Sequence, residues 1–358
     1  MPLAGHWKDW DLMAEWIRDA TGETVQLSVL ENDMMLVLLK EGFADREYLA
    51  RYTDFGPDIE AHLADKTPKW ASAITGLPTD EITAFARLYG GTERSFLRVG
   101  FGFTRSRNGS AGMHAVTCLP AITGAWKHRG GGAFFLNLDN WKLDTTLAHG
   151  LDLIDPRTRI IDQSRIGPIL CGDKDALAGG PPVMAMVMQN ANSANVAPDS
   201  AAVARGLGRE DLFTCVHEQF MTATAKYADI LLPAAMFLEY DDIYYGLGHT
   251  HLTVGPAVLD RYEDCRTNHE LVCALAQRLG TNHASFHMSA VELLDATLRA
   301  SGRGTWDEAV ARGWVDCDEG FEVSHFLNGF PSKDGRFHFK PDWKAVGPYH
   351  AGMKPLLT

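Results

Sequence analysis

The feature that most constrains the fold is an uninterrupted apolar run, Val-Met-Ala-Met-Val-Met at residues 183–188. Its length suits a β-strand, and an unbroken apolar run predicts a strand that is buried on both faces of a parallel sheet. Three further runs, at 95–99, 212–216 and 230–232, are separated by segments with helical periodicity. Strands that alternate with helices indicate βαβ units. The sequence therefore predicts an α/β fold with a parallel sheet.

The helical periodicity also suggests how the chain is divided. Its 358 residues are enough for two domains. Apolar positions at helical spacing between 32 and 89 predict about four helices, and one more amphipathic helix is expected around 9–19. A helix is also predicted at 268–279, with Gly280 as its C-cap. We expect a mostly helical segment over 1–92, an α/β domain over 93–342 and a linker over 343–358.

Charge and cysteine content exclude several classes of protein. The net charge of −13 opposes non-specific binding to nucleic acid or to an anionic membrane. No apolar run approaches the ~20 residues of a membrane helix, and the first eleven residues contain no apolar signal core. Six cysteines without a Cys-x-x-Cys pair do not match the usual zinc or iron–sulfur spacings. We expect a cytoplasmic chain with reduced thiols, no nucleic-acid partner and no membrane insertion.

Candidate ligand-binding residues follow the predicted strands. In a parallel sheet, ligands bind outside the carboxyl ends of the strands, because the strand-to-helix loops gather there. The polar and glycine residues at these positions are Gly100, Gly102 and Thr104 after the first strand, Gln189, Asn190 and Asn192 after the second, and Glu218 and Thr222 after the third. The sequence therefore predicts a ligand-binding edge.

Each group of these residues has a possible ligand-binding role and a purely structural alternative. Gly100 and Gly102 would let backbone amides approach a phosphate, yet Arg105 stands where the dinucleotide fingerprint has a third glycine, so both can be turn glycines. The amides after the second strand suit a ribose or a pterin, or they hold a loop through Asx-turns. A carboxylate at 218 matches the paired N–H donors of guanine, or it forms a surface salt bridge.

The remaining candidates are weaker. Thr222 and Thr224 are typical of helix N-caps, whether or not one also contacts a phosphate. His249 and His251 would share a face of a strand, but they have no nearby third ligand for a metal. Neither a Walker phosphate loop nor a Gly-x-Ser-x-Gly elbow is present. An ordinary mononucleotide-binding domain is therefore disfavoured.

Residues 211–239 closely resemble a segment of the molybdopterin oxidoreductases of the dimethyl sulfoxide reductase and formate dehydrogenase superfamily. Segments that match in the family's order are 98–102, 119–126, 130–132, 189–199 and 268–280, and the likeness covers roughly 34–342. The chain departs from the family at Ser193, where a proline is common, and at His217, where glutamine is frequent. The stretch 240–255 aligns loosely.

The resemblance implies a cofactor and a set of contacts. Such enzymes bind two molybdopterin guanine dinucleotides between two α/β domains, and this chain would hold one of them. The matching positions are Gly100, Gly102, Thr104, Gln189, Asn190, Asn192, Glu218, Thr222 and Asn268. Glu218 falls where the family has an acidic residue that binds guanine. No catalytic residue or metal ligand is assigned.

The resemblance also implies missing parts. Residues 1–92 would be the remnant of a second, incomplete α/β domain, and 343–358 would lead to an absent β-barrel domain. The iron–sulfur domain and the molybdenum ligand have no counterpart here, so no iron–sulfur cluster is expected in this chain. We expect the central part of a molybdoenzyme that is inactive alone, and a complementary polypeptide that carries the missing domains. The alternative is a non-catalytic structural module, as in the related large subunit of respiratory complex I.

Overall fold

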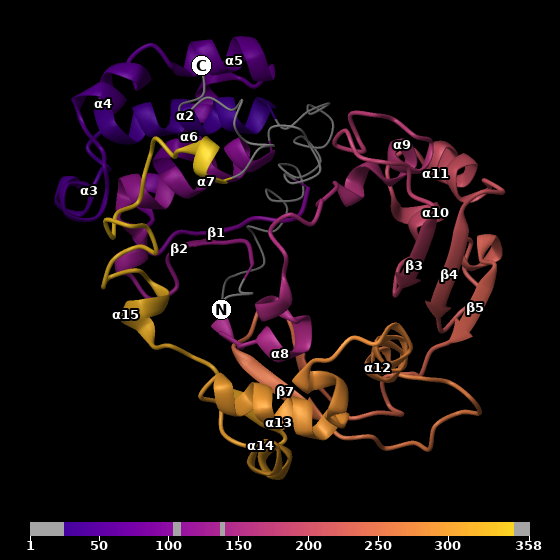
Figure 1. The fold of residues 1–358 in the computed structure, drawn as a ribbon. Coiled ribbons are helices and arrows are strands. Elements are labelled where there is room, and N and C mark those ends of the chain that lie inside the picture. The colour runs from indigo at the N-terminus through magenta and orange to yellow at the C-terminus, as the bar shows by residue number, and fades with distance from the viewer. Residues whose placement is uncertain (1–24, 103–108, 137–139, 347–358) are drawn as a thin grey trace. The chain divides into compact units, whose positions relative to one another are not determined.

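The computed structural model describes residues 25–102, 109–136 and 140–346. The chain forms two compact units, of which the first combines Met1–Asn137 with Glu319–Thr358 and the second is Leu138–Asp318 (Figure 1). The helix expected around 9–19 lies outside the described residues. Among the described helices, none combines the length and the apolar character needed to cross a bilayer.

The first unit begins with a group of helices. Their bounds are α2 (Val25–Lys40), α3 (Arg46–Tyr52), α4 (Pro57–Leu63), α5 (Pro68–Thr75) and α6 (Thr79–Gly91). Within the described residues, five helices lie where about four were expected, and α2 begins at Val25, before the expected start near residue 32. Local signals set the helix starts: Pro57 and Pro68 occupy first-turn positions, and the side chain of Asp45 accepts the N–H of Tyr48 at 2.8 Å.

A strand–helix–strand segment completes the core of this unit. The expected strand and the helix after it are confirmed as β1 (Phe96–Arg98) and α7 (Gly109–Thr123), and β2 (Gly132–Phe134) pairs parallel with β1. Helix α7 packs against α2, which also contacts α5 and α6. Buried residues from α2, α3 and α7, such as Leu38, Leu49 and Ile122, form one hydrophobic core.

The last described segment, 319–346, returns to the first unit. It contains α15 (Phe321–Ser324) and α16 (Trp343–Val346). Phe337 forms a β-bridge with Thr53, and the guanidinium of Arg336 donates to the carbonyl of Thr53 at 3.0 Å. The two units therefore do not follow the expected boundary between 92 and 93, since α7 and this returning segment both pack with the N-terminal helices.

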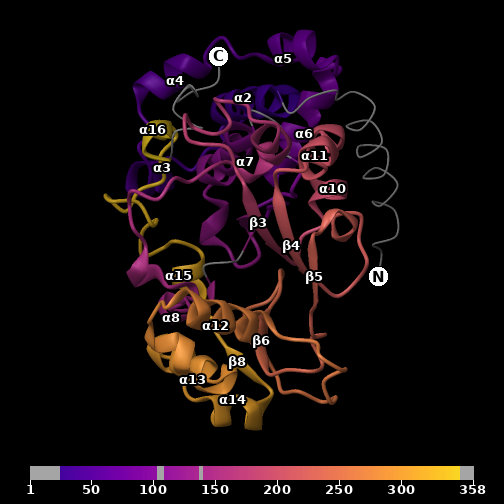
Figure 2. The same ribbon diagram turned by 45° about the vertical axis from the view of Figure 1, so that its right-hand side comes forward.

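The second unit contains the predicted parallel sheet. Its strands are β3 (Ala185–Gln189), β4 (Phe213–Glu218) and β5 (Ile230–Pro233), in that order and all parallel (Figure 2). Helices α9 (Ile166–Leu170), α10 (Ser193–Val196) and α11 (Ser200–Leu207) accompany the strands. Leu170 and Val203 from these helices pack with Met188 and Val216 in a common core. The alternation of strands and helices is thus confirmed.

The expectation that the strand at 183–188 is buried on both faces is wrong. The face that carries Met188 and Val216 packs on helices α9 and α11. On the opposite face, Val187 is 56% exposed, Phe213 47% and Ile230 46%. We call these three side chains the open sheet face. The strand has an apolar sequence on both faces, but the chain places a helical layer against one of them only.

An antiparallel sheet that the sequence did not reveal follows. It consists of β6 (Asp242–Tyr245), β7 (His251–Gly255) and β8 (Trp314–Asp316), with β7 in the centre. Helices α8 (Thr146–His149), α12 (Asn268–Leu279), α13 (Ala290–Ala300) and α14 (Trp306–Arg312) belong to the same unit. The expected helix at 268–279 is confirmed as α12, and Gly280 caps it in a left-handed conformation with φ of 68°.

Candidate functional site

The carboxyl ends of β3 and β4 lie side by side in the second unit. Gln189, the last residue of β3, is in register with His217 of β4, and Glu218 ends β4. The helix α12 begins at Asn268, whose side chain reaches the same edge. The structure therefore brings the side chains of Gln189 and Asn268 into contact, and Glu218 ends the neighbouring strand β4.

A buried histidine connects two of these residues. The Nε2 atom of Gln189 lies 3.4 Å from Oδ1 of Asn268, and Nδ1 of His217 lies 3.1 Å from the same oxygen. The other ring nitrogen of His217, Nε2, is 3.0 Å from the carbonyl oxygen of Arg266. Because the His217 side chain is only 1% exposed, these contacts fix its ring between β3, β4 and the start of α12.

The start of α12 is fixed by a capping box. The Thr267 hydroxyl accepts the N–H of Glu270 at 3.2 Å, and the Glu270 carboxylate accepts the N–H of Thr267 at 2.9 Å. Arg261 binds the same carboxylate at 2.6 Å, which holds the pKa of Glu270 below its usual range against the opposing effect of burial. These residues line a cavity of about 400 Å³ beside Asn268. The first turn, and with it Asn268, is held in a defined place.

Two of the predicted residues, Asn192 and Thr222, form hydrogen bonds within the loops that follow β3 and β4. Oδ1 of Asn192 accepts the backbone N–H of Thr224 at 3.2 Å and its hydroxyl at 3.0 Å. The Thr224 oxygen in turn accepts the N–H of Ala194 at 2.9 Å. The Thr222 hydroxyl accepts at 3.1 Å the N–H of Ala225, which is the first residue of the short 3₁₀-helix η6 (Ala225–Tyr227), although the N-cap position itself is Thr224. These bonds join the loop after β3 to the loop after β4 and agree with the loop-holding and capping alternatives.

Glu218 and Asn190 are more accessible. The Glu218 carboxylate is half-buried and accepts the N–H of Gln219 at 2.8 Å, and within the described part of the chain it forms no ion pair. Asn190 is exposed and adopts a left-handed backbone with φ of 54°, which asparagine tolerates better than most residues. The surface salt bridge considered for Glu218 is therefore not formed with any residue that the structure describes.

The remaining predicted residues belong to the first unit. Gly100 and Gly102 follow β1 and are exposed, and Thr104 lies outside the described residues. A Cβ atom added at either glycine would meet no atom of the described residues within 4 Å, and neither has a positive φ. The packing of the chain therefore does not require glycine at these two positions, which leaves room for a close approach by another group.

Sequence reasoning missed the role of His217 and of Thr224. In the sequence, His217 stood out as a departure from the family, where glutamine is frequent, and Thr224 as a helix cap. The in-register pairing of His217 with Gln189 makes the bridge to Asn268, but a single sequence does not reveal register. Thr224 is completely buried, which is unusual for a capping threonine and reflects its bonds to the loop after β3.

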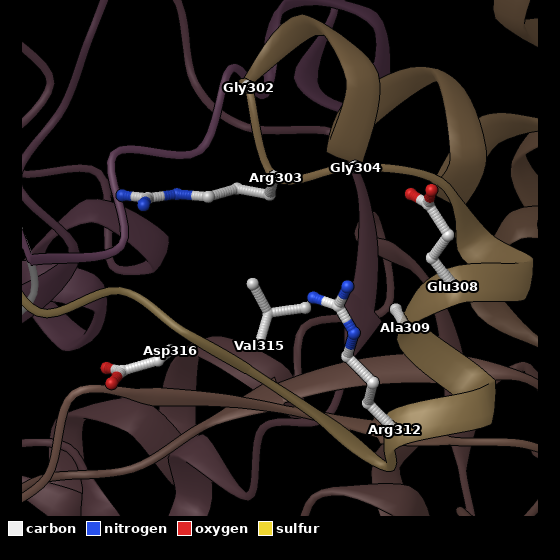
Figure 3. A pocket seen from close by; sticks show the side chains of 8 residues that line it. All are labelled: Gly302, Arg303, Gly304, Glu308, Ala309, Arg312, Val315 and Asp316. Atoms are coloured by element: carbon white, nitrogen blue, oxygen red, sulfur yellow. The ribbon is translucent and has the colours of Figure 1, made fainter.

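A second cavity lies near α14 and is unrelated to this edge. It has a volume of about 270 Å³ and is lined by Gly302, Arg303, Gly304, Glu308, Ala309, Arg312, Val315 and Asp316 (Figure 3). The Arg303 guanidinium donates to the carbonyl of Trp141 at 3.0 Å and points away from Arg312. This arginine therefore holds the segment around Trp141 in place.

Comparison with known proteins identifies the family. The family model described as molybdopterin oxidoreductase matches residues 5–278, so the chain belongs to this family. It is 35% identical to the probable oxidoreductase YoaE of Bacillus subtilis over 272 residues, which are 75% of this chain and 38% of YoaE. Over 305 residues it is 26% identical to the dimethyl sulfoxide reductase DmsA of Escherichia coli, which covers 74% of this chain and 36% of DmsA.

The fold has a counterpart among solved structures. Acetylene hydratase from Pelobacter acetylenicus superposes with a TM-score of 0.70 over 92% of this chain and 49% of that chain, at 16% identity. The mixed α/β fold with small parallel sheets is thus shared with that protein. This chain spans less than two fifths of the length of YoaE and DmsA and about half the length of acetylene hydratase.

Proposed function

We propose that this chain is the central cofactor-binding part of an oxidoreductase that uses molybdopterin guanine dinucleotide, and that it is inactive alone. Membership of the molybdopterin oxidoreductase family supports the cofactor class. The observation that carries the proposal is the contact of Gln189 with Asn268 at the carboxyl edge of β3 and β4, where Glu218 ends β4. This edge is where ligands of parallel sheets bind.

The donor and acceptor groups at this edge fit the proposed cofactor. A carboxylate at Glu218 can accept both N–H donors of guanine, and the amides of Gln189, Asn190 and Asn268 offer donors and acceptors for ribose or pterin groups. Asn192 and Thr222 hold the loops around them. The bound cofactor would supply the redox chemistry, while these side chains bind and orient it.

Gly100 and Gly102 enter this proposal through the family match. The open space at Gly100 and Gly102 allows the close approach that a phosphate needs. Thr104 is included among the proposed contacts only because it matches the family's sequence. A cytoplasmic location follows as an expectation from the reduced cysteines.

The direct test measures the cofactor. The chain is purified from a molybdenum-replete host and denatured, and the released metal, fluorescent oxidised pterin and GMP are quantified. Near-stoichiometric pterin and GMP would support the proposal. Their absence would show that this chain does not hold the dinucleotide by itself and would favour the non-catalytic structural module.

A substitution tests the guanine contact. Glu218→Gln keeps the size of the side chain but removes the charge that accepts the two guanine donors. Because hydrogen bonds to charged groups contribute about 1.5–3 kcal/mol, retained GMP should fall by about ten- to a hundredfold. Glu210→Gln, an exposed position before β4, is the matched control. Equal GMP retention in both variants would refute the role of Glu218.

A complementary polypeptide is the second part of the proposal. The chain spans less than two fifths of the length of YoaE and DmsA, and the open sheet face exposes apolar side chains that parallel sheets normally cover. We propose that a polypeptide with the remaining domains covers this face. Its apolar helices would supply the second layer of the sheet.

A further inference from the structure

The outer edge of β3 carries a row of unpaired backbone groups. In the described part of the chain, β3 has β4 as its only neighbour in the sheet (Figure 2). The N–H of Phe213 donates to the carbonyl of Met184 at 3.0 Å. Successive residues of a strand turn their backbone groups to opposite sides, so every second residue of β3 bonds to β4 and the others face outward. The outward-facing residues are Ala185, Val187 and Gln189, whose N–H and C=O groups have no backbone partner among the described residues.

The opposite edge of the same sheet is protected by the chain itself. Pro233 ends β5 and has no N–H to offer to another strand. The carbonyl of Pro233 accepts the N–H of Arg266 at 3.1 Å, and Ala234 forms a β-bridge with Arg266. The carboxyl end of the β5 edge is therefore closed, whereas the edge of β3 is open along the whole strand.

The sequence around β3 lacks the features that keep an exposed edge from pairing. Proteins protect such edges with charged side chains, with proline or with bulges. Residues 176–198 contain no charged side chain and no histidine, and Pro181 and Pro182 stand before the strand, outside the row of free backbone groups. An apolar and uncharged edge is typical of a strand that has a second neighbour.

We propose that β3 is an inner strand of a larger sheet, and that the complementary polypeptide supplies the strand that pairs with its outer edge. The inference rests on the proposed function, which includes such a polypeptide, and it names the structure by which the polypeptide binds. A row of alternating donors and acceptors is matched by another strand, whereas a helix bonds its own backbone groups. The added strand would bond to the outward-facing groups of Ala185, Val187 and Gln189.

The complementary polypeptide fits this edge better than a second copy of the chain does. The chain spans less than two fifths of the length of YoaE and DmsA, so the rest of such a protein is long enough to supply a strand. Two copies that paired antiparallel through β3 about a twofold axis would place their open sheet faces side by side on one surface. That pairing would enlarge the exposed apolar patch, whereas one polypeptide can cover the face and the edge together.

Amide hydrogen exchange tests the row of backbone groups. In the ¹⁵N-labelled chain alone, we expect the amides of Ala185 and Val187 to exchange rapidly and those of Met186 and Met188 slowly. The probe is the part of YoaE outside its similarity to this chain. Its binding should slow the exchange of Ala185 and Val187 at least about tenfold. Exchange at these two amides that stays rapid in the complex would overturn the inference.

Proline substitution tests the edge apart from the open sheet face. Ala185→Pro removes one outward N–H at the first residue of the strand, where proline is tolerated, and no hydrogen bond to β4 is lost. Co-purification with the same part of YoaE should fall about tenfold, while the matched control Ala185→Ser, which keeps the N–H, should stay within about twofold. Met186→Pro removes an N–H that faces β4 and should instead lower the midpoint of urea unfolding. Equal association of Ala185→Pro and Ala185→Ser would refute the added strand.

The strand addition and the proposed function can fail separately. If the chain retains pterin and GMP but Ala185→Pro associates as well as Ala185→Ser, the cofactor proposal stands and the strand addition is wrong. If the proline effect is seen without retained cofactor, the strand addition stands and the cofactor proposal is wrong. Self-association of the chain alone that Ala185→Pro abolishes would assign the edge to a second copy and overturn the choice of partner.

Discussion

At the scale of single residues, the clearest consequence of burial concerns Asp33 in α2. Both carboxylate oxygens are buried, and no donor in the described part of the chain reaches them. Burial raises the pKa of Asp33 from 3.8 to about 7. The folded chain thus keeps a proton that the unfolded chain releases near pH 4, so the free energy of unfolding falls as pH rises between these values.

Asp33→Asn should remove this dependence. The shift of pKa from 3.8 to about 7 corresponds to roughly 4 kcal/mol. We expect the variant to gain a few kcal/mol at pH 8 and almost nothing at pH 4, as measured by urea unfolding at both pH values. Asp264→Asn, on an exposed loop, should show no such gain. An equal effect of Asp33→Asn at both pH values would contradict the explanation.

Thr224 shows how one hydroxyl joins two loops. It donates to Asn192 and accepts from Ala194 in a buried place. Thr224→Val keeps the volume but leaves the buried N–H of Ala194 without its acceptor, while Oδ1 of Asn192 keeps only the backbone N–H of residue 224, so the free energy of unfolding should fall by about 1–3 kcal/mol. Thr222→Val, at a half-buried position, should cost less. Chemical unfolding of both variants checks the order, and a larger loss at Thr222 would argue against this account.

At the scale of elements, sequence reasoning succeeded where the pattern is local. The strand before Gly100 and the helix α12 with Gly280 at its end were predicted correctly, because periodicity and capping signals act within a few residues. The strands β6, β7 and β8 were missed. Their pairing joins residues near 251 to residues near 316, and nothing local marks that distant partner. The candidate ligand-binding edge was predicted because the ends of strands can be located from local sequence patterns. The hydrogen bond between His217 and Asn268 depends on strand register, which a single sequence does not reveal.

The α12 capping box makes a prediction at this scale. Thr267→Ala removes the acceptor for the Glu270 N–H, and the free energy of unfolding should fall by about 1 kcal/mol, while Thr267→Ser should keep most of it. Because Asn268 is the first residue of α12, the alanine variant should also broaden the Asn268 amide signals. Unchanged stability together with unchanged Asn268 signals would show that the box does not hold this turn.

At the scale of the whole molecule, the open sheet face is the feature that one sequence could not predict. The apolar run at the second strand correctly indicated a strand, but the layer that should cover its other face is absent from the described structure. The apolar sequence of this strand thus indicates a covering layer that the described residues do not form.

The proposed partner can be tested through this face. The part of YoaE outside its similarity to this chain is co-expressed with the tagged chain, and their association is measured by co-purification. Val187→Asp should reduce association at least about tenfold without changing the unfolding transition, because a charge would then enter an apolar interface. Val258→Asp, at another exposed site, is the control. Association that ignores Val187→Asp, or no association at all, would count against this interface.

The return of residues 319–346 to the first unit sets an order of events during synthesis. The helices of that unit leave the ribosome first, but the segment that bonds to Thr53 follows only after roughly 180 residues of the second unit. At ~5–20 residues per second, this delay is about 10–40 s. For that time the aromatic surface around Trp126, which later packs on Phe326 and Phe330, has no partner from the returning segment. The nascent chain is therefore most dependent on chaperones while its second unit is being made.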